Sequence, residues 1–165
     1  MAGAITRGVL FVHSAPRALC PHVEWAVAAE LGVRVRLDWT AQPAAPGHLR
    51  TEVGWRGRPG TAGRLAGALR GWSVLRYEVT EEPSAGCDGE RYAVTPTLGV
   101  FRATMSANGD LLVSEDRLRN LLATATGPQL SLGIDTLLGS AWDDELERFR
   151  EAGEGAQINW LHQVV

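Results

Sequence analysis

The sequence contains no lysine, only two cysteines and no long hydrophobic run, and each shortage excludes a class of protein. Two cysteines in 165 residues are too few for a disulfide framework, and their spacing matches no zinc site. No apolar segment approaches the roughly 18 residues that a membrane-spanning helix needs. We therefore expect a cytoplasmic protein with reduced thiols, no metal, no cofactor and no membrane association.

Because lysine is absent, all sixteen basic residues are arginines, and most of them lie in the first half of the chain. Residues 1–80 carry ten arginines and five acidic residues, a net charge of +5. Residues 81–165 carry six arginines and fourteen acidic residues, a net charge of −8. An overall charge of −3 argues against nonspecific nucleic-acid binding, which needs a strong basic excess. A local arginine surface in the first half can still bind an acidic protein or an anionic ligand.

The first half shows the hydrophobic periodicity of alternating strands and helices. Strands are predicted at 8–13, 33–40, 48–55 and 72–80, and helices at 21–31 and from Pro59 to Gly71. The order strand, helix, strand, strand, helix, strand is typical of a ferredoxin-like βαββαβ unit. We therefore predict a ferredoxin-like half over residues 1–80.

The second half, residues 81–165, predicts a hairpin followed by helices. Asn108-Gly109 is the strongest short hairpin signal in the chain, because both residues tolerate positive φ. Ser114 is placed to cap the first of three helices, and INWLHQVV predicts a closing strand. The predicted buried stripe of that first helix consists of Leu118, Leu121, Leu122 and Ala125. We expect the two halves to pack as a single α+β domain spanning residues 1–165.

Four arginines are predicted to share the outward face of two paired strands. The alternation in 33–40 and 48–55 places apolar side chains on one face of an antiparallel pair, and the opposite face carries Arg34, Arg36, Arg50 and Arg56. Either this face is simply solvated, or it holds a partner, since arginine is enriched where carboxylates or phosphates are bound.

Residues 56–64 suggest a second way of binding an anion. Glycines at the start of a helix let backbone amides approach a phosphate, and Arg56, Arg58 and Arg64 add positive charge. The segment matches no established nucleotide-binding motif. The competing interpretation is structural: the glycines at 63, 67 and 71 would form a smooth helix face that approaches the sheet closely.

Cys20 stands directly before a helix that begins at Pro21, where the helix dipole favours the thiolate. In addition, YAVTPTLGVF, NGDLLV and SEDRLRNLL, within residues 92–122, resemble the end of a thioredoxin fold. That resemblance implies a cis Pro96 facing Cys20, and a thioredoxin-like fold with an inserted βα unit as the alternative fold. No second cysteine stands at the resolving position, and a buried structural cysteine is the competing interpretation.

Several segments together resemble an uncharacterised family of proteins from high-GC Gram-positive bacteria: CPHVEWA, GWRGRPGTAGRLAGALRGWSVLRYEVTEEPS, TPTLG, SANGDLLVSEDR and AWDDELERFR. The resemblance runs from end to end, and it brings no assigned activity and no catalytic residue. It implies a link to fatty-acid synthesis, because members of the family lie near genes of that pathway. An acyl carrier protein or a fatty-acid-synthesis enzyme is the acidic partner that this link implies.

Three functions therefore remain open from the sequence. The first is a non-catalytic accessory or regulatory protein that binds an acidic partner or anionic ligand through first-half arginines. The second is a single-cysteine thiol enzyme that uses Cys20 and Pro96. The third is a phosphate or coenzyme A binder at residues 56–64. The oligomeric state is left undetermined.

Overall fold

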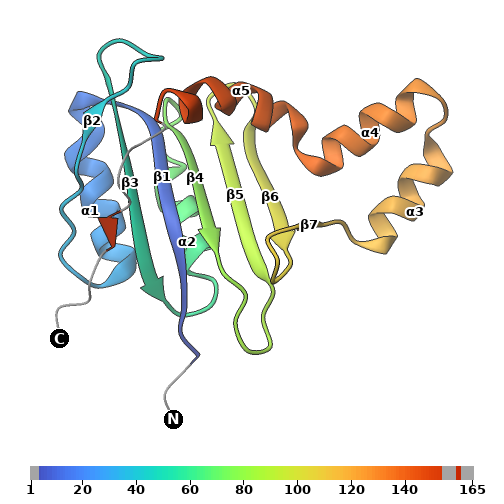
Figure 1. Cartoon of the computed structure of the whole chain (residues 1–165), viewed down its shortest axis with the longest axis horizontal. Helices are drawn as coiled ribbons and strands as arrows, with labels where there is room; N and C mark the ends of the chain where they lie inside the picture. Colours follow the sequence, from blue (N-terminus) through green and yellow to red (C-terminus); the bar gives the residue numbers. More distant parts are fainter. Residues whose placement is uncertain (1–3, 154–158, 161–165) are drawn as a thin grey trace.

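The computed structural model describes residues 4–153 and 159–160, and within them it has the expected α+β composition (Figure 1). The strands are β1 (Thr6–Pro16), β2 (Thr40–Ala41), β3 (His48–Gly57), β4 (Arg76–Glu81), β5 (Gly89–Thr95), β6 (Gly99–Met105), β7 (Leu111–Leu112) and β8 (Asn159–Trp160). The helices are α1 (Cys20–Leu31), α2 (Thr61–Leu69), α3 (Glu115–Thr124), α4 (Pro128–Leu138) and α5 (Ser140–Glu151), with a short 3₁₀ turn at Arg17–Leu19. None of the helices described is long and apolar enough to cross a membrane.

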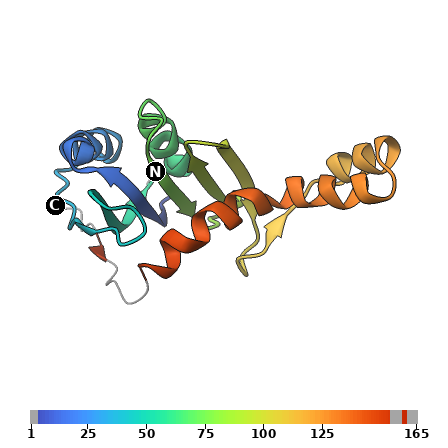
Figure 2. The same ribbon diagram turned by 90° about the horizontal axis from the view of Figure 1, so that it is seen from above.

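The strands form one continuous sheet in the order β2-β3-β1-β4-β5-β6-β7, and neighbours along this path run antiparallel. β8 adds to β3 in parallel at Val53 and Gly54. It falls within the predicted closing strand, whose other residues lie outside those described. Figure 2 shows α1 and α2 on one face of the sheet and α5 on the other.

The main core lies between the sheet and the two helices α1 and α2. Trp55, Tyr77 and Leu65 are among its fully buried side chains. A smaller cluster on the opposite face joins α5 to β5 and β6, where Leu146 packs with Ala93, Phe101 and Ala103. The sheet is therefore covered on both faces, but only in part on the α5 side.

The predicted strand at 33–40 is wrong for all but its last residue. Residues 34–39 form no regular structure, and only Thr40 and Ala41 pair with β3. The segment lies along α1 instead, because the Glu24 carboxylate accepts hydrogen bonds from the Leu37 backbone amide (3.0 Å) and from Trp39 Nε1 (3.1 Å). The alternation still predicted orientation correctly, since Leu37 is buried while Arg34 and Arg36 are exposed.

The predicted hairpin at Asn108-Gly109 is confirmed, with β6 and β7 pairing across it. The sequence prediction did not include a second hairpin, because residues 91–106 contain no Asn-Gly or Asp-Gly turn signal. The structure divides this run at Pro96–Leu98 into β5 and β6, with Gly99 at φ +75°. That division adds a strand to the sheet and turns the chain back toward β7.

The helices α3 and α4, which we call the arm, project away from the sheet (Figures 1 and 2). α3 begins after Ser114 as predicted, although the Ser114 hydroxyl makes no capping hydrogen bond. The predicted buried stripe on this helix is wrong: Leu118 and Leu122 are exposed, and neither α3 nor α4 contains a buried residue. The apolar spacing was helical, but among the described residues the fold leaves Leu118 and Leu122 exposed and brings only Leu121 close to α4, at Gly133.

Candidate functional site

A cavity of about 500 Å³ opens on the sheet face that α5 crosses. Its volume lies in the range of small-molecule sites. The lining comes from β1, β3, β4, β5, both ends of α5 and the residue Gly153 beyond it, and consists of Phe11, His13, Arg50, Glu52, Glu78, Arg91, Asp143, Arg150 and Gly153. The sheet register explains this assembly, because Phe11 stands directly between Glu52 on β3 and Glu78 on β4.

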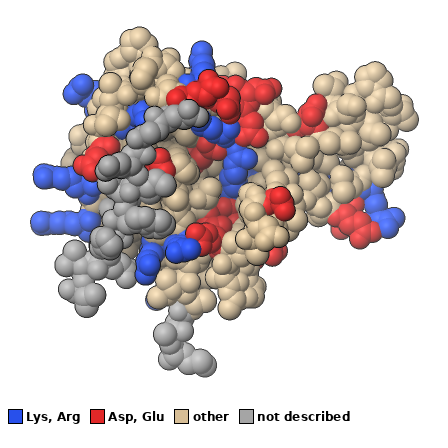
Figure 3. Space-filling model, in the orientation of Figure 1, with Lys and Arg blue, Asp and Glu red and all other residues tan. Residues whose placement is uncertain are grey.

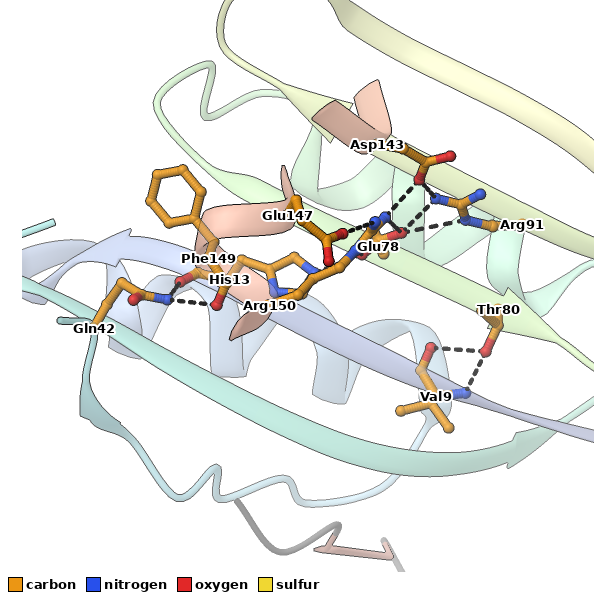
Figure 4. A network of polar contacts seen from close by, with 10 residues as sticks. All are labelled: Val9, His13, Gln42, Glu78, Thr80, Arg91, Asp143, Glu147, Phe149 and Arg150. Carbon is orange, nitrogen blue, oxygen red and sulfur yellow. Dashed lines mark hydrogen bonds and ion pairs between the residues drawn. The ribbon is translucent and has the colours of Figure 1, made fainter. Parts of the chain in front are cut away.

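Glu78 is the centre of a buried polar network in this cavity (Figure 4). Arg150 donates from Nε to Oε2 (2.9 Å) and from Nη2 to Oε1 (2.6 Å), which is a bidentate pair. Arg91 donates from Nη2 to Oε1 (2.8 Å), and His13 Nε2 lies 2.6 Å from Oε2. Three residues from two strands and a helix thus converge on one carboxylate.

Asp143 completes the network and balances its charge. Its Oδ1 accepts from Nη2 of Arg91 (2.6 Å) and from Nη2 of Arg150 (2.8 Å). Burial by itself raises the pKa of Glu78, but the hydrogen bonds and charges of His13 and Arg150 outweigh it and hold that pKa well below its ordinary value. Two guanidinium groups and two carboxylates therefore neutralise one another.

His13 reaches the network through an irregularity in β1. The register of β1 shifts against both neighbours just after Val12, and such bulges re-aim side chains. Gln42 fixes the bulge by donating from Nε2 to the main-chain oxygen of His13 (2.7 Å). The Phe11 ring stacks against the His13 ring, with 5.9 Å between centroids.

Arg50, one of the four arginines predicted to share a face, lies in this cavity and not on an open surface with Arg34, Arg36 and Arg56. Its Nε is buried and has no hydrogen-bond partner among the described residues. The main chain at Gly153 lies so close to its guanidinium that a Cβ there would overlap it. The neighbouring Glu52 has a raised pKa, because burial outweighs the opposing charge of Arg50.

Three other predicted arginines do meet. Arg56, Arg58 and Arg64 line a depression of about 300 Å³ where the end of α1 approaches the start of α2. Its full lining, which we call the arginine depression, is Glu30, Leu31, Arg56, Gly57, Arg58, Thr61 and Arg64. Arg64 donates to Thr61 Oγ1 (2.6 Å) and lies 3.7 Å from Glu30, whereas Arg56 and Arg58 form no ion pair with any described residue.

The backbone amides at the start of α2 already bind an anion from the protein itself. The Glu81 carboxylate accepts hydrogen bonds from the amides of Gly60 (2.8 Å) and Ala62 (2.9 Å) and is almost fully buried. The backbone amides predicted to bind a phosphate at residues 56–64 are therefore already bound to the Glu81 carboxylate. Of the three glycines predicted to form a smooth helix face, Gly71 lies beyond the end of α2, and only Gly63 makes a close approach, because a Cβ there would lie 2.9 Å from Tyr92 Oη.

Cys20 and Pro96 do not have the geometry that the thioredoxin resemblance implies. Cys20 is buried, its thiol donates to the Pro16 carbonyl (3.6 Å), and burial together with the nearby Glu24 charge raises its pKa. The predicted lowering of this pKa is wrong, since burial outweighs the helix terminus. Pro96 is exposed in the β5–β6 turn, and the described residues contain no cis peptide bond.

Sequence reasoning missed the cavity network, although a signal for it was present. Asp143 lies in the first turn of α5, where interaction with the helix dipole accounts for an acidic residue without any site. A solitary histidine such as His13 predicts no site by itself, and no sequence motif includes Glu78 or Arg91. The signal that could have indicated the cavity is the set of polar side chains that alternate along the central strands with core residues such as Val12, Tyr77 and Val79. Alternation places these polar side chains on the sheet face opposite the main core.

Comparison with known proteins gives a family and no activity. No curated protein and no solved structure matches the chain. A family model described as protein of unknown function (DUF3145) matches residues 9–163. Since that match spans nearly the whole sequence, both the strands of the cavity and the arginine depression fall within it, and the chain belongs to the DUF3145 family.

Proposed function

We propose that this protein is a non-catalytic accessory or regulatory protein that binds an acidic protein partner at the arginine depression. The observation that supports the proposal is the local excess of positive charge: three guanidinium groups share the depression with a single carboxylate, Glu30, among its lining residues. Guanidinium groups hold carboxylates and phosphates through paired hydrogen bonds. Arg56 and Arg58 are exposed and have no ion-pair partner in the described part of the chain, so both are available.

Arg34 and Arg36 extend the proposed surface beyond the depression. Both are exposed, and Arg34 follows Leu31, a lining residue, by three positions. Figure 3 shows basic side chains projecting on the α1 side of the molecule, while acidic side chains gather over α5. A partner with an acidic surface would therefore be attracted to the α1 side and repelled by the α5 side.

The partner class that we test first is an acyl carrier protein, because these small proteins are acidic. Titration of the full chain with the host's acyl carrier protein, followed by calorimetry, should show binding that weakens as salt rises, since exposed charges are screened within about 10 Å at 0.1 M salt. The double variant Arg56→Glu/Arg58→Glu should weaken binding at least tenfold. Arg70→Glu is the matched control, because Arg70 is exposed at the opposite end of α2.

Two results would refute the site. Absence of binding by the wild-type chain would remove the proposed partner class. Equal weakening by the Arg70→Glu control would mean that attraction depends on overall charge and not on the arginine depression.

A phosphate or coenzyme A is a second candidate ligand for the same depression, supported by its volume of about 300 Å³ and its arginines. The ligand would have to bind through side chains, because Glu81 uses the helix amides. Melting-temperature measurements with coenzyme A and with inorganic phosphate test this: a rise that Arg58→Glu abolishes supports it, and no rise at millimolar ligand rejects it. A thiol enzyme using Cys20 is not favoured, since its thiol is buried.

We also propose that the first half is a ferredoxin-like unit within a single domain. The spatial order β2-β3-β1-β4, with α1 and α2 together on one face, supports the ferredoxin-like proposal. A thioredoxin-like sheet needs central parallel pairs, whereas β1 runs antiparallel to both neighbours. The pairing of β4 with β5 joins the two halves in one sheet, which supports a single domain. The cytoplasmic location stays a prediction.

A further inference from the structure

The cavity on the α5 side of the sheet holds two charged side chains that the network around Glu78 does not neutralise. Three arginines and three carboxylates are among its lining residues. Two of the arginines and two of the carboxylates pair with one another in the network (Figure 4). Arg50 and Glu52 remain, one charge of each sign, and neither forms a hydrogen bond or an ion pair with the other or with a further residue described.

Arg50 and Glu52 face the cavity together because they lie two positions apart on β3. Alternate residues of a strand share a face, and the intervening Thr51 and the following Val53 are buried on or beside the opposite, core-facing side. The sheet register places Glu52 directly opposite Phe11 on β1. The strand therefore presents a guanidinium group and a carboxylate to the same enclosed space.

Both side chains are held partly out of water, which favours a ligand that pairs with them. Arg50 is half-buried, and its Nε is fully buried with no acceptor in the described part of the chain. Glu52 is also half-buried, and burial raises its pKa in spite of the positive charge of Arg50 nearby. A desolvated polar group without a partner costs free energy, and a ligand that supplies the partner recovers it.

The wall beside Glu52 is aromatic. Phe11 lines the cavity and is half-buried, and its ring lies nearly parallel to that of His13, with 7° between the planes. Aromatic faces bind rings in offset stacks and bury aliphatic groups. The cavity can therefore hold an apolar group against Phe11 while charged groups of the same ligand reach β3.

We propose that this cavity binds a free α-amino acid with an apolar or aromatic side chain. Arg50 holds the carboxylate, Glu52 holds the ammonium group, and Phe11 contacts the side chain. Residues two positions apart on a strand are separated by about 6.6 Å, which two hydrogen bonds of about 2.8 Å and the head of an amino acid can bridge. The site shares no lining residue with the arginine depression, so this inference is independent of the proposed partner.

A zwitterion suits this site better than a ligand with one charge. A simple carboxylate would pair with Arg50 and leave Glu52 desolvated without a donor, and a simple amine would do the reverse. A charged ligand side chain finds no further unpaired partner among the described lining residues, because the remaining four charges belong to the network.

The test is the binding of L-phenylalanine and L-leucine to the full-length chain, measured by melting temperature and by calorimetry. At ten times the dissociation constant, the ligand should raise the melting temperature by about 3–6 °C. Hydrocinnamate and isocaproate are the same molecules without the ammonium group, and phenethylamine and isoamylamine lack the carboxylate. Each analogue should bind about tenfold more weakly or worse, because it loses one charge-assisted hydrogen bond.

Two variants test the residues. Arg50→Met and Glu52→Gln should each weaken amino-acid binding about tenfold or more. Arg50→Met should not lower the melting temperature of the protein by itself, since it removes a buried Nε that has no acceptor among the described residues. The matched controls are Arg70→Met and Glu82→Gln, which change exposed residues outside the cavity and should bind as the wild type does.

Three results would overturn the proposal. The first is no binding of either amino acid by the wild type at millimolar concentration, including the case in which a residue outside those described pairs with Arg50. The second is equal binding of an analogue that lacks one charged group. The third is binding that survives both cavity substitutions or that the controls weaken equally, with circular dichroism verifying that every variant is folded.

Discussion

Replacing Glu78 by glutamine should destabilise the protein far more than the same replacement at a surface ion pair. The substitution keeps the side-chain shape but removes the charge that Arg150 and Arg91 share. Only 9% of the Glu78 side chain is exposed, so the two guanidinium groups would be left with Asp143 as the one carboxylate that they share, while Glu147 lies 3.4 Å from Arg150 alone. Removing one partner of a buried ion pair costs about 3–5 kcal/mol, and we expect about 3 kcal/mol here because Asp143 remains.

The matched control is Glu82→Gln. Glu82 pairs with Arg7 at 2.7 Å, but the two side chains are 51% and 53% exposed. Such a pair contributes about 0–1 kcal/mol. Urea unfolding followed by tryptophan fluorescence measures both losses against the wild type. If Glu78→Gln loses less than about 1 kcal/mol, the claim that this carboxylate organises the cavity is wrong.

The pH dependence gives an independent check on the same residue. The folded-state pKa of Glu78 is lowered, so its contribution is fully present above the unfolded-state pKa of about 4.3 and is lost as pH falls toward the folded-state pKa. The difference in unfolding free energy between the wild type and Glu78→Gln should therefore be constant near pH 7 and shrink below about pH 4. A difference that grows on acidification would contradict this sign.

Three further predictions concern single contacts. Iodoacetamide should alkylate the exposed Cys87 at least tenfold faster than the buried Cys20 at pH 8, and comparable rates by mass spectrometry would contradict the burial of Cys20. Glu81→Gln should cost about 1–3 kcal/mol in urea unfolding, because it weakens the hydrogen bonds at the start of α2, and a neutral result would show that those amides need no anion. Gly139→Ala should lower the melting temperature by several degrees, since Gly139 has φ +74° and a Cβ there would lie 2.5 Å from Phe101; an unchanged melting temperature would show that the turn adapts.

Much of the local structure could be predicted because it depends on neighbouring residues. Pro21 and Gly32 delimit α1, and Gly139 ends α4, since these residues restrict or permit backbone angles wherever they occur. The Asn108-Gly109 hairpin follows from the same principle. The orientation of side chains along 33–39 was also predictable, because alternation depends only on an extended backbone.

Pairing could not be predicted in the same way, because it depends on which groups lie nearby in space. The segment 33–39 alternates like a strand, yet the acceptor for its Leu37 amide is the Glu24 side chain and not a neighbouring strand. Likewise, the spacing of Leu118 and Leu122 is helical in either a buried or an exposed helix. Periodicity identifies the face of an element, whereas what covers that face is a long-range property.

The sequence by itself determined the α+β composition, the Asn108-Gly109 hairpin, the arginine-only basic charge and the excess of that charge in the first half. Only the tertiary structure decided how the charges are used: it buried Glu78 among His13, Arg91 and Arg150, separated Arg50 from the other arginines, and brought Arg56, Arg58 and Arg64 to one depression. The physical reason is that electrostatic interaction depends on distance and burial, and His13 and Arg150, which are 65 and 72 positions from Glu78 in the sequence, reach it only after the sheet has formed.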